Sequence, residues 1–70
     1  MGLRIVERFN RGIWEVIRMK DIKAGDRFRM KENDGPLEEY ITDDNGKTEF
    51  IALSDAEIIN DVYGVKAEGI

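Results

Sequence analysis

Apolar and polar residues alternate through much of the chain, and many of the apolar residues are β-branched or aromatic. Two such stretches, Leu3 to Phe9 and Ile13 to Met19, flank Asn10-Arg11-Gly12. This pattern predicts a β-hairpin whose three-residue loop holds Gly12 in the left-handed conformation, as a type I turn with a G1 bulge. The apolar spacing over residues 3–17 also fits a helix, but Gly12 and the β-branched residues favour strands.

A three-residue loop sets the register of this hairpin, with Phe9 opposite Ile13. The expected core face then carries Leu3, Ile5, Phe9, Ile13, Ile17 and Met19. The opposite face, expected to point outward, carries Arg4, Val6, Arg8, Trp14, Val16 and Arg18. This register places Glu7 opposite Glu15, and opposed like charges are unfavourable. A two-residue turn would instead pair Arg8 with Glu15, so the register stays open between these two alternatives.

The clearest half-buried strand comes after a glycine turn. Ile22 is expected to be an apolar plug, and the turn forms because Gly25 accepts a positive φ and Asp26 can bond nearby backbone donors. The strand over residues 27–31 alternates cleanly, with its basic residues outward. The residues expected to face the core are Phe28 and Met30.

The sequence of the second half of the chain predicts short strands between tight turns. Asn33-Asp34-Gly35-Pro36 predicts a turn. Strands over residues 37–41 and 48–53 are expected to form a hairpin around residues 42–47, in which Asn45-Gly46 suits a type I′ turn.

The final residues combine a helix signal with a strand signal. Ser54 lies three residues before Glu57, which is capping-box spacing and predicts one helical turn through Asn60. A last strand is expected over residues 62–67, with Gly64 marking a bulge or a close approach, and residues 68–70 are expected to be a loose tail.

About six short strands, tight turns and one short helical turn predict a mainly β fold, in a single domain over residues 1–70. Closing a sheet removes exposed edges. The expected architecture is therefore a small, partly open β-barrel or a strongly bent antiparallel sheet.

The net charge of −4 is divided unevenly along the sequence. Residues 1–31 hold nine Lys or Arg against four Asp or Glu, which gives +5, and residues 32–70 hold two against eleven, which gives −9. Such a molecule can associate head to tail or attract an oppositely charged partner. A chain this short also buries a small core, so association would add stability.

Histidine and cysteine are both absent, which removes Ser-His and Cys-His nucleophile systems and thiolate metal sites. The ligand types of Asp43-Asp44-Asn45-Gly46 suit calcium, but their spacing does not match a calcium loop. The sequence predicts no enzyme activity, cofactor, metal or small-molecule substrate. No apolar run approaches the roughly 20 residues that cross a bilayer. With no disulfide to form, a cytoplasmic location without a membrane partner is expected.

A basic and aromatic face supports one alternative, because single-stranded nucleic acids bind to cations interleaved with stacking rings. The candidate residues of this face, for nucleic acid or another partner, are Arg4, Arg8, Trp14, Arg18, Lys20, Arg27 and Arg29. The overall pI of about 4.7 argues against nucleic acid. Trp14 in the core, with basic strands paired to acidic ones, would also explain the pattern without a ligand.

The segment Asp21-Ile22-Lys23-Ala24-Gly25-Asp26-Arg27-Phe28 resembles the Gly-Asp turn, or GD-box, found in many small β-barrels. That resemblance implies a turn packed over a neighbouring strand, with structural roles for Gly25 and Asp26 and no activity. Residues 20–67 also resemble small proteins encoded by tailed bacteriophages. The resemblance rests on Ile22 to Met30, Asn45-Gly46, Phe50-Ile51-Ala52 and Val62-Tyr63-Gly64-Val65. It carries no function over to any residue.

These observations favour a non-catalytic interaction or assembly module, encoded by a phage or prophage, that associates with a protein partner or with itself. The alternative is a single-stranded nucleic-acid binder.

Overall fold

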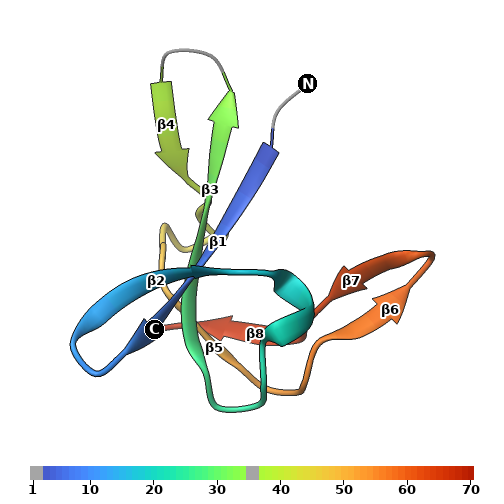
Figure 1. Ribbon diagram of the computed structural model, residues 1–70. Coiled ribbons are helices and arrows are strands. Elements are labelled where there is room, and N and C mark those ends of the chain that lie inside the picture. Colours follow the sequence, from blue (N-terminus) through green and yellow to red (C-terminus); the bar gives the residue numbers. More distant parts are fainter. Residues whose placement is uncertain (1–2, 35–36) are drawn as a thin grey trace.

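The computed structural model describes residues 3–34 and 37–70. Six strands form one antiparallel sheet, in which β2, β1, β3, β5 and β8 are successive neighbours and β4 also pairs with β3 (Figure 1). Strands β6 and β7 form a separate two-stranded sheet. The elements in chain order are β1 (Leu3–Asn10), β2 (Ile13–Ile17), the 3-10 helix η1 (Met19–Asp21), β3 (Arg27–Asp34), β4 (Leu37–Tyr40), β5 (Phe50–Ala52), β6 (Glu57–Ile59), β7 (Val62–Gly64) and β8 (Ala67–Gly69).

The prediction of a mainly β, bent antiparallel fold with one short helical turn is confirmed, and the sheet does not close into a barrel. Its long central strands are β1 and β3, and β2 crosses in front of them in Figure 1. Among the described residues the buried side chains form one core cluster, and they are Val6, Ile22, Phe28, Phe50 and Ala52. Ile22 and Phe28 are buried as predicted, and Met30 packs against the same cluster.

The register of the first hairpin follows the two-residue alternative. Arg11 and Gly12 have φ values of 53° and 84°, which fits a type I′ turn, and Arg8 lies opposite Glu15. The three-residue loop was wrong because it opposes two carboxylates, whereas the observed register forms an ion pair with a 2.7 Å N–O distance. The expected outward face is also wrong, since Val6 belongs to the core.

The Gly25–Asp26 turn packs against β5. The Gly25 N–H donates to the Ala52 carbonyl at 2.8 Å, and the Ala52 N–H donates back to the Asp26 carbonyl at 2.8 Å. The Asp26 carboxylate accepts from the Lys23 N–H at 2.9 Å. Gly25 has a φ of 91°, so the turn has the local chemistry that the sequence predicted and aims Phe28 into the core.

Strands β4 and β5 do not pair with each other as predicted. Both pair with the same side of β3, β4 along Lys31–Asp34 and β5 at Arg27 and Phe28. The segment between them turns at Asp43, whose carboxylate accepts from the N–H groups of Asn45 and Lys47. Gly46 has a φ of 79° and Asn45 is not in the positive region, so this is a type I turn with a G1 bulge rather than a type I′ turn. The turn predicted at residues 33–36 includes residues 35 and 36, which lie outside the described residues.

The helical turn predicted through Asn60 is wrong, because residues 57–59 form β6. Asn60 and Asp61 have φ values of 52° and 66°, and this pair makes the type I′ turn to β7. The helical turn of the structure is instead η1, where a strand had been expected to continue to Met19.

The last strand divides at Gly64 into β7 and β8. The expected loose tail is wrong, since β8 pairs with β5 and the Ile70 N–H donates to the Glu49 carbonyl at 3.0 Å. A Cβ atom on Gly69 would lie 2.8 Å from the Cβ of Lys47. The absence of a side chain at Gly69 therefore allows the close approach of β8 to the 43–47 turn.

Candidate interaction surfaces

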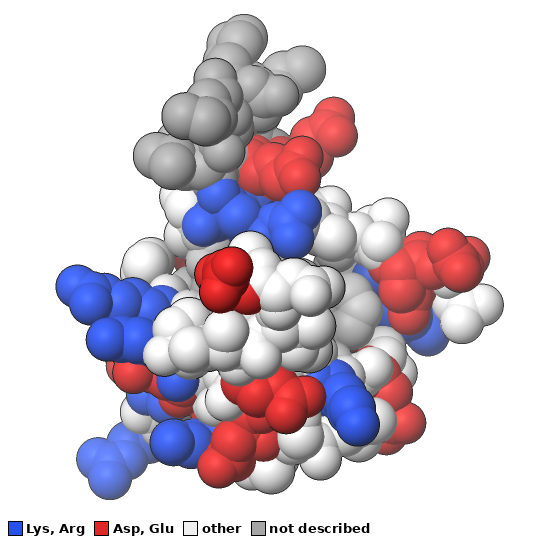
Figure 2. All heavy atoms as spheres, turned by 90° about the vertical axis from the view of Figure 1, so that its right-hand side faces the viewer, with Lys and Arg blue, Asp and Glu red and all other residues white. Residues whose placement is uncertain are grey.

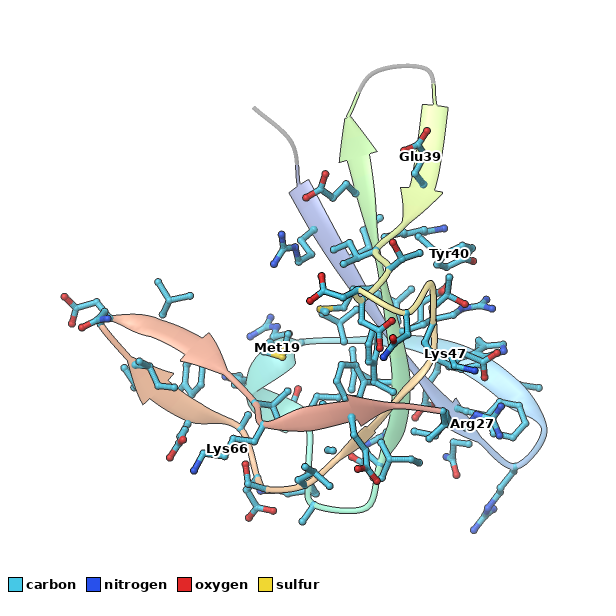
Figure 3. All side chains as sticks on the ribbon, turned by 180° about the vertical axis from the view of Figure 1, so that it is seen from behind. Met19, Arg27, Glu39, Tyr40, Lys47 and Lys66 are labelled. Carbon is cyan, nitrogen blue, oxygen red and sulfur yellow. The ribbon has the colours of Figure 1, made fainter. Side chains whose placement is uncertain are left out.

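The first candidate surface is the side of the sheet opposite the core, called here the aromatic face. The pairs Phe9–Trp14, Glu7–Arg29 and Lys31–Tyr40 place alternate residues of β1, β2, β3 and β4 on this side. Figure 3 shows Tyr40 and Arg27 on the same side of β3. The residues of the aromatic face are Glu7, Phe9, Trp14, Arg27, Arg29, Lys31 and Tyr40.

Arg29 lies at the centre of the aromatic face. Its Cζ atom is 4.1 Å from the centroid of the Trp14 ring and 4.6 Å from that of Tyr40. Its Nε donates to a Glu7 carboxylate oxygen at 2.8 Å, and the Tyr40 hydroxyl donates to the same oxygen at 3.5 Å. One guanidinium thus contacts two aromatic rings and one carboxylate. The positive charge of Arg29 is balanced within this cluster by the negative charge of Glu7.

Arg27 is held in a similar way at the margin of this face. Its guanidinium lies 5.6 Å from the centroid of the Phe9 ring, and its Nη2 is 2.6 Å from a Glu49 carboxylate oxygen. The two arginines of the aromatic face are therefore neutralised within the chain. A nucleic acid would have to displace both carboxylates, and a stacked base would have to displace Arg29 from Trp14 or Tyr40.

The predicted basic face is thus divided among different parts of the molecule. Trp14, Arg27 and Arg29 come together, but Arg4 and Arg8 alternate with the side chains of the aromatic face and lie on the side of Val6. Arg4 pairs with Glu32 at 3.2 Å, and Arg8 pairs with Glu15 and Asp26. The hydrogen bond to Glu15 is the main cause of the raised pKa of Arg8. Arg18 and Lys20 are exposed, Arg18 just before η1 and Lys20 within it.

Sequence reasoning placed Phe9 in the core and assigned no role to Tyr40. The signal that would have placed Phe9 beside Trp14 was the charge of Arg8 and Glu15, because choosing the register that pairs them moves both rings to one face.

The second candidate surface is the hairpin of β6 and β7, residues 57–64, called here the finger. It extends from the body to the right of Figure 1 and belongs to its own two-stranded sheet. Ile58 lies opposite Tyr63 and Ile59 opposite Val62, so each face of the finger carries one apolar pair. All four side chains are exposed, with relative accessibilities of 62% for Ile58, 51% for Ile59, 66% for Val62 and 43% for Tyr63.

The finger was missed because the capping-box spacing at Ser54 suggested a helix. The stronger signal was Asn60-Asp61 between Ile58-Ile59 and Val62-Tyr63, since Asn and Asp tolerate the left-handed conformation that both central residues of a type I′ turn adopt. Figure 2, in which the finger side faces the viewer, shows uncharged surface across the centre with carboxylate-bearing residues within and below it.

The described residues contain no group of three or more Asp or Glu side chains arranged to hold a metal ion. None of their helices has the length and apolar character to traverse a membrane. Comparisons with protein-family models, with curated proteins and with solved structures found no match to this chain.

Proposed function

We propose that this chain is a non-catalytic interaction or assembly module that docks to protein through the finger. The observation that carries the proposal is the exposure of four large apolar side chains on one hairpin, Ile58, Ile59, Val62 and Tyr63. Each face of the finger exposes an adjacent apolar pair. Clustered exposed apolar side chains are typical of protein interaction sites, whereas single exposed apolar residues are common everywhere.

The architecture of the finger supports the same proposal. A two-stranded hairpin alone in water is marginally stable, and it usually needs a further strand or a packed surface. The type I′ turn at Asn60-Asp61 shapes the hairpin in advance, which lowers the ordering cost of binding. Contact with a partner would supply the packing that the body of this chain leaves incomplete.

A phage or prophage origin and a cytoplasmic location are also proposed. The first is supported by the resemblance of residues 20–67 to small proteins of tailed phages, and the second by the lack of cysteine. The gene neighbourhood tests the origin: flanking virion or replication genes would support it, and a conserved set of metabolic genes would contradict it.

Single-stranded nucleic-acid binding is the second proposal, favoured by three aromatic rings and three cations on one face. It is the weaker of the two, because Arg27 and Arg29 are paired with carboxylates. Trp14 fluorescence titrated with an oligonucleotide at low salt tests it, since phosphate contacts are strongest there. An unchanged emission spectrum would refute nucleic-acid binding through this face.

The finger and the aromatic face can be compared directly because each presents one tyrosine of similar exposure, Tyr63 at 43% and Tyr40 at 40%. A photoreactive phenylalanine analogue is introduced at either position, and the protein is irradiated in its native cells. The proposal predicts a discrete crosslinked protein product, with another protein or a second copy, from position 63 and little from position 40. Equal products from both positions, or none from position 63, would overturn it.

A further inference from the structure

Resting on the proposed function of the finger, we infer its partner: the open edge of β2 in a second copy of this chain. The contact joins two different surfaces, the finger of one copy and the β2 edge of the next. Three observations select this edge, namely its unpaired backbone, its apolar side chains and its charge.

Strand β2 is the last strand on one side of the sheet and pairs with β1 alone within residues 3–34 and 37–70. Its outer backbone N–H and C=O groups are therefore open to another strand, which is how sheet edges capture extended segments. Strands β6 and β7 likewise pair only with each other in the described part of the chain, so each has an open outer edge to offer.

The β2 edge and the finger both carry exposed apolar side chains on both of their faces. Ile13 and Val16 are 61% and 71% exposed, and their positions three residues apart on a strand put them on opposite faces. The finger is apolar on both faces too, with Ile58 and Tyr63 on one and Ile59 and Val62 on the other. A finger strand added beside β2 would cover exposed apolar groups above and below the sheet at once.

Charge distinguishes the β2 edge from the other possible acceptors. Three exposed cations flank this strand, Arg11 before it and Arg18 and Lys20 after it, and none of them takes part in the ion pairs of the described residues. The finger presents the exposed acids Glu57 and Asp61. The opposite edge of the sheet, β8, carries the acidic Glu68 at its centre and follows the exposed Lys66, so it offers no excess of positive charge. Two fingers in contact would bring their acids together. Opposite charges therefore favour β2 over β8 or a second finger.

Because finger and edge are different surfaces, each copy that binds one neighbour keeps a free finger at one end and a free edge at the other. Such heterologous contacts continue into rings or filaments rather than stopping at a symmetric pair. The inferred arrangement is thus a head-to-tail assembly held by apolar contact and steered by charge.

Two exposed-site variants separate the surfaces. The finger variant is Ile58→Ser with Val62→Ser, which keeps the β2 edge. The edge variant is Ile13→Glu, which keeps the finger and adds a charge that repels its acids. Leu53→Glu is the matched control, because Leu53 is 56% exposed and lies outside both surfaces. Circular dichroism verifies that each variant keeps the wild-type fold.

Sedimentation velocity is measured from about 10 µM to about 1 mM protein, a range that spans moderate to weak self-association. The wild type and the Leu53→Glu control are expected to form oligomers that grow with concentration, and each surface variant alone is expected to bind at least about tenfold more weakly. An equimolar mixture of the finger and edge variants retains one complete interface and is expected to form a 1:1 dimer.

A second edge variant tests the same surface without changing Ile13, in case Ile13→Glu does not fold. Arg18→Glu with Lys20→Glu reverses the charge beside β2 without altering an apolar contact, and it should weaken association at low salt more than at high salt. A monomeric wild type, or a mixture that does not form the dimer, would overturn the inference. Crosslinks from position 63 to a different protein would then leave the proposed function standing.

Discussion

At the scale of single residues, Arg29 organises the aromatic face. It is ion-paired with Glu7, whose side chain is 12% exposed, and it covers the rings of Trp14 and Tyr40. A planar guanidinium can stack on rings and bond a carboxylate together, whereas an ammonium group cannot reproduce this geometry.

Arg29→Lys keeps the charge and removes the stacking. We expect it to lower the free energy of unfolding by about 1 kcal/mol and to change the emission of Trp14, both measured in one urea titration. Arg18→Lys is the control, since Arg18 is exposed, and it should change stability by less than about 0.5 kcal/mol. Equal effects of the two substitutions would show that Arg29 acts only as a charge.

The turn that directs Phe28 into the core requires a positive φ at Gly25, and a substitution there tests this requirement. A Cβ at Gly25 would meet nothing within 4 Å, but its φ of 91° is costly for any other residue. Gly25→Ala should therefore destabilise by about 1–2 kcal/mol for conformational reasons alone. At Gly64 the φ is ordinary and the nearest contact is 3.8 Å, so Gly64→Ala should be nearly neutral in thermal unfolding. If Gly25→Ala did not change stability, the turn would not require the positive φ of Gly25.

Residues whose role is local were predictable from the sequence. Ile22, Gly25 and Phe28 lie where alternation and turn chemistry placed them. Val6 and Trp14 were predicted to share the outward face, but Val6 lies in the core and Trp14 on the opposite side of the sheet. The two separate because shifting the hairpin register by one residue turns every side chain of one strand over relative to its partner. The register depended on an energetic comparison between two turns that apolar alternation alone does not decide.

At the scale of elements, contacts between distant segments determined which strands pair and where strands form, and local sequence signals did not predict these outcomes. Strands β4 and β5 share one side of β3, although the turn between them suggested a hairpin. The capping-box spacing at Ser54 competed with the β-branched residues of the finger, and the strands formed instead. These outcomes depend on contacts between distant segments, which the pattern within one segment does not contain.

The close contact between β8 and the 43–47 turn gives a prediction at this scale. Gly69→Ala would place its Cβ against the Cβ of Lys47, an atom that cannot move away without its backbone. We expect β8 to detach partly, with a loss of about 1–3 kcal/mol and faster amide hydrogen exchange in β8 and β5. Wild-type exchange rates in both strands would show that the contact is easily relieved.

The finger should be the least stable strand pair when the protein is dilute. It has its own two-stranded sheet and exposed apolar side chains, and β7 lies beside the short helix η1, so few contacts resist its opening. Amides of residues 57–64 should exchange at least about tenfold faster than those at the centre of β3. Equal protection in the two segments would contradict the low stability expected of the finger.

At the scale of the whole molecule, a small core accompanies a strongly divided charge. The buried set within the described residues has five members, and the two parts of the chain carry +5 and −9. Part of this charge is balanced internally, as in the pairs of Arg27 and Arg29. Within the part of the chain that the structure describes, the cations beside β2 and the acids of the finger take part in no ion pair, so they are available to a partner.

The charge contribution can be separated from the apolar one by salt. Raising the salt concentration from about 0.05 M to about 0.5 M should weaken self-association several-fold without abolishing it, because screening removes the electrostatic attraction and leaves the apolar contact. Analytical sedimentation at both concentrations measures this. Stronger association at high salt would show that charge opposes the contact.

Amide hydrogen exchange of the wild type at low and high protein concentration tests the central claim most directly. Docking of the finger on a second copy predicts that protection rises with concentration in residues 57–64 and in β2, while β5 and β8 stay unchanged. Protection that rises elsewhere, with the finger still exchanging rapidly in the associated protein, would contradict the claim.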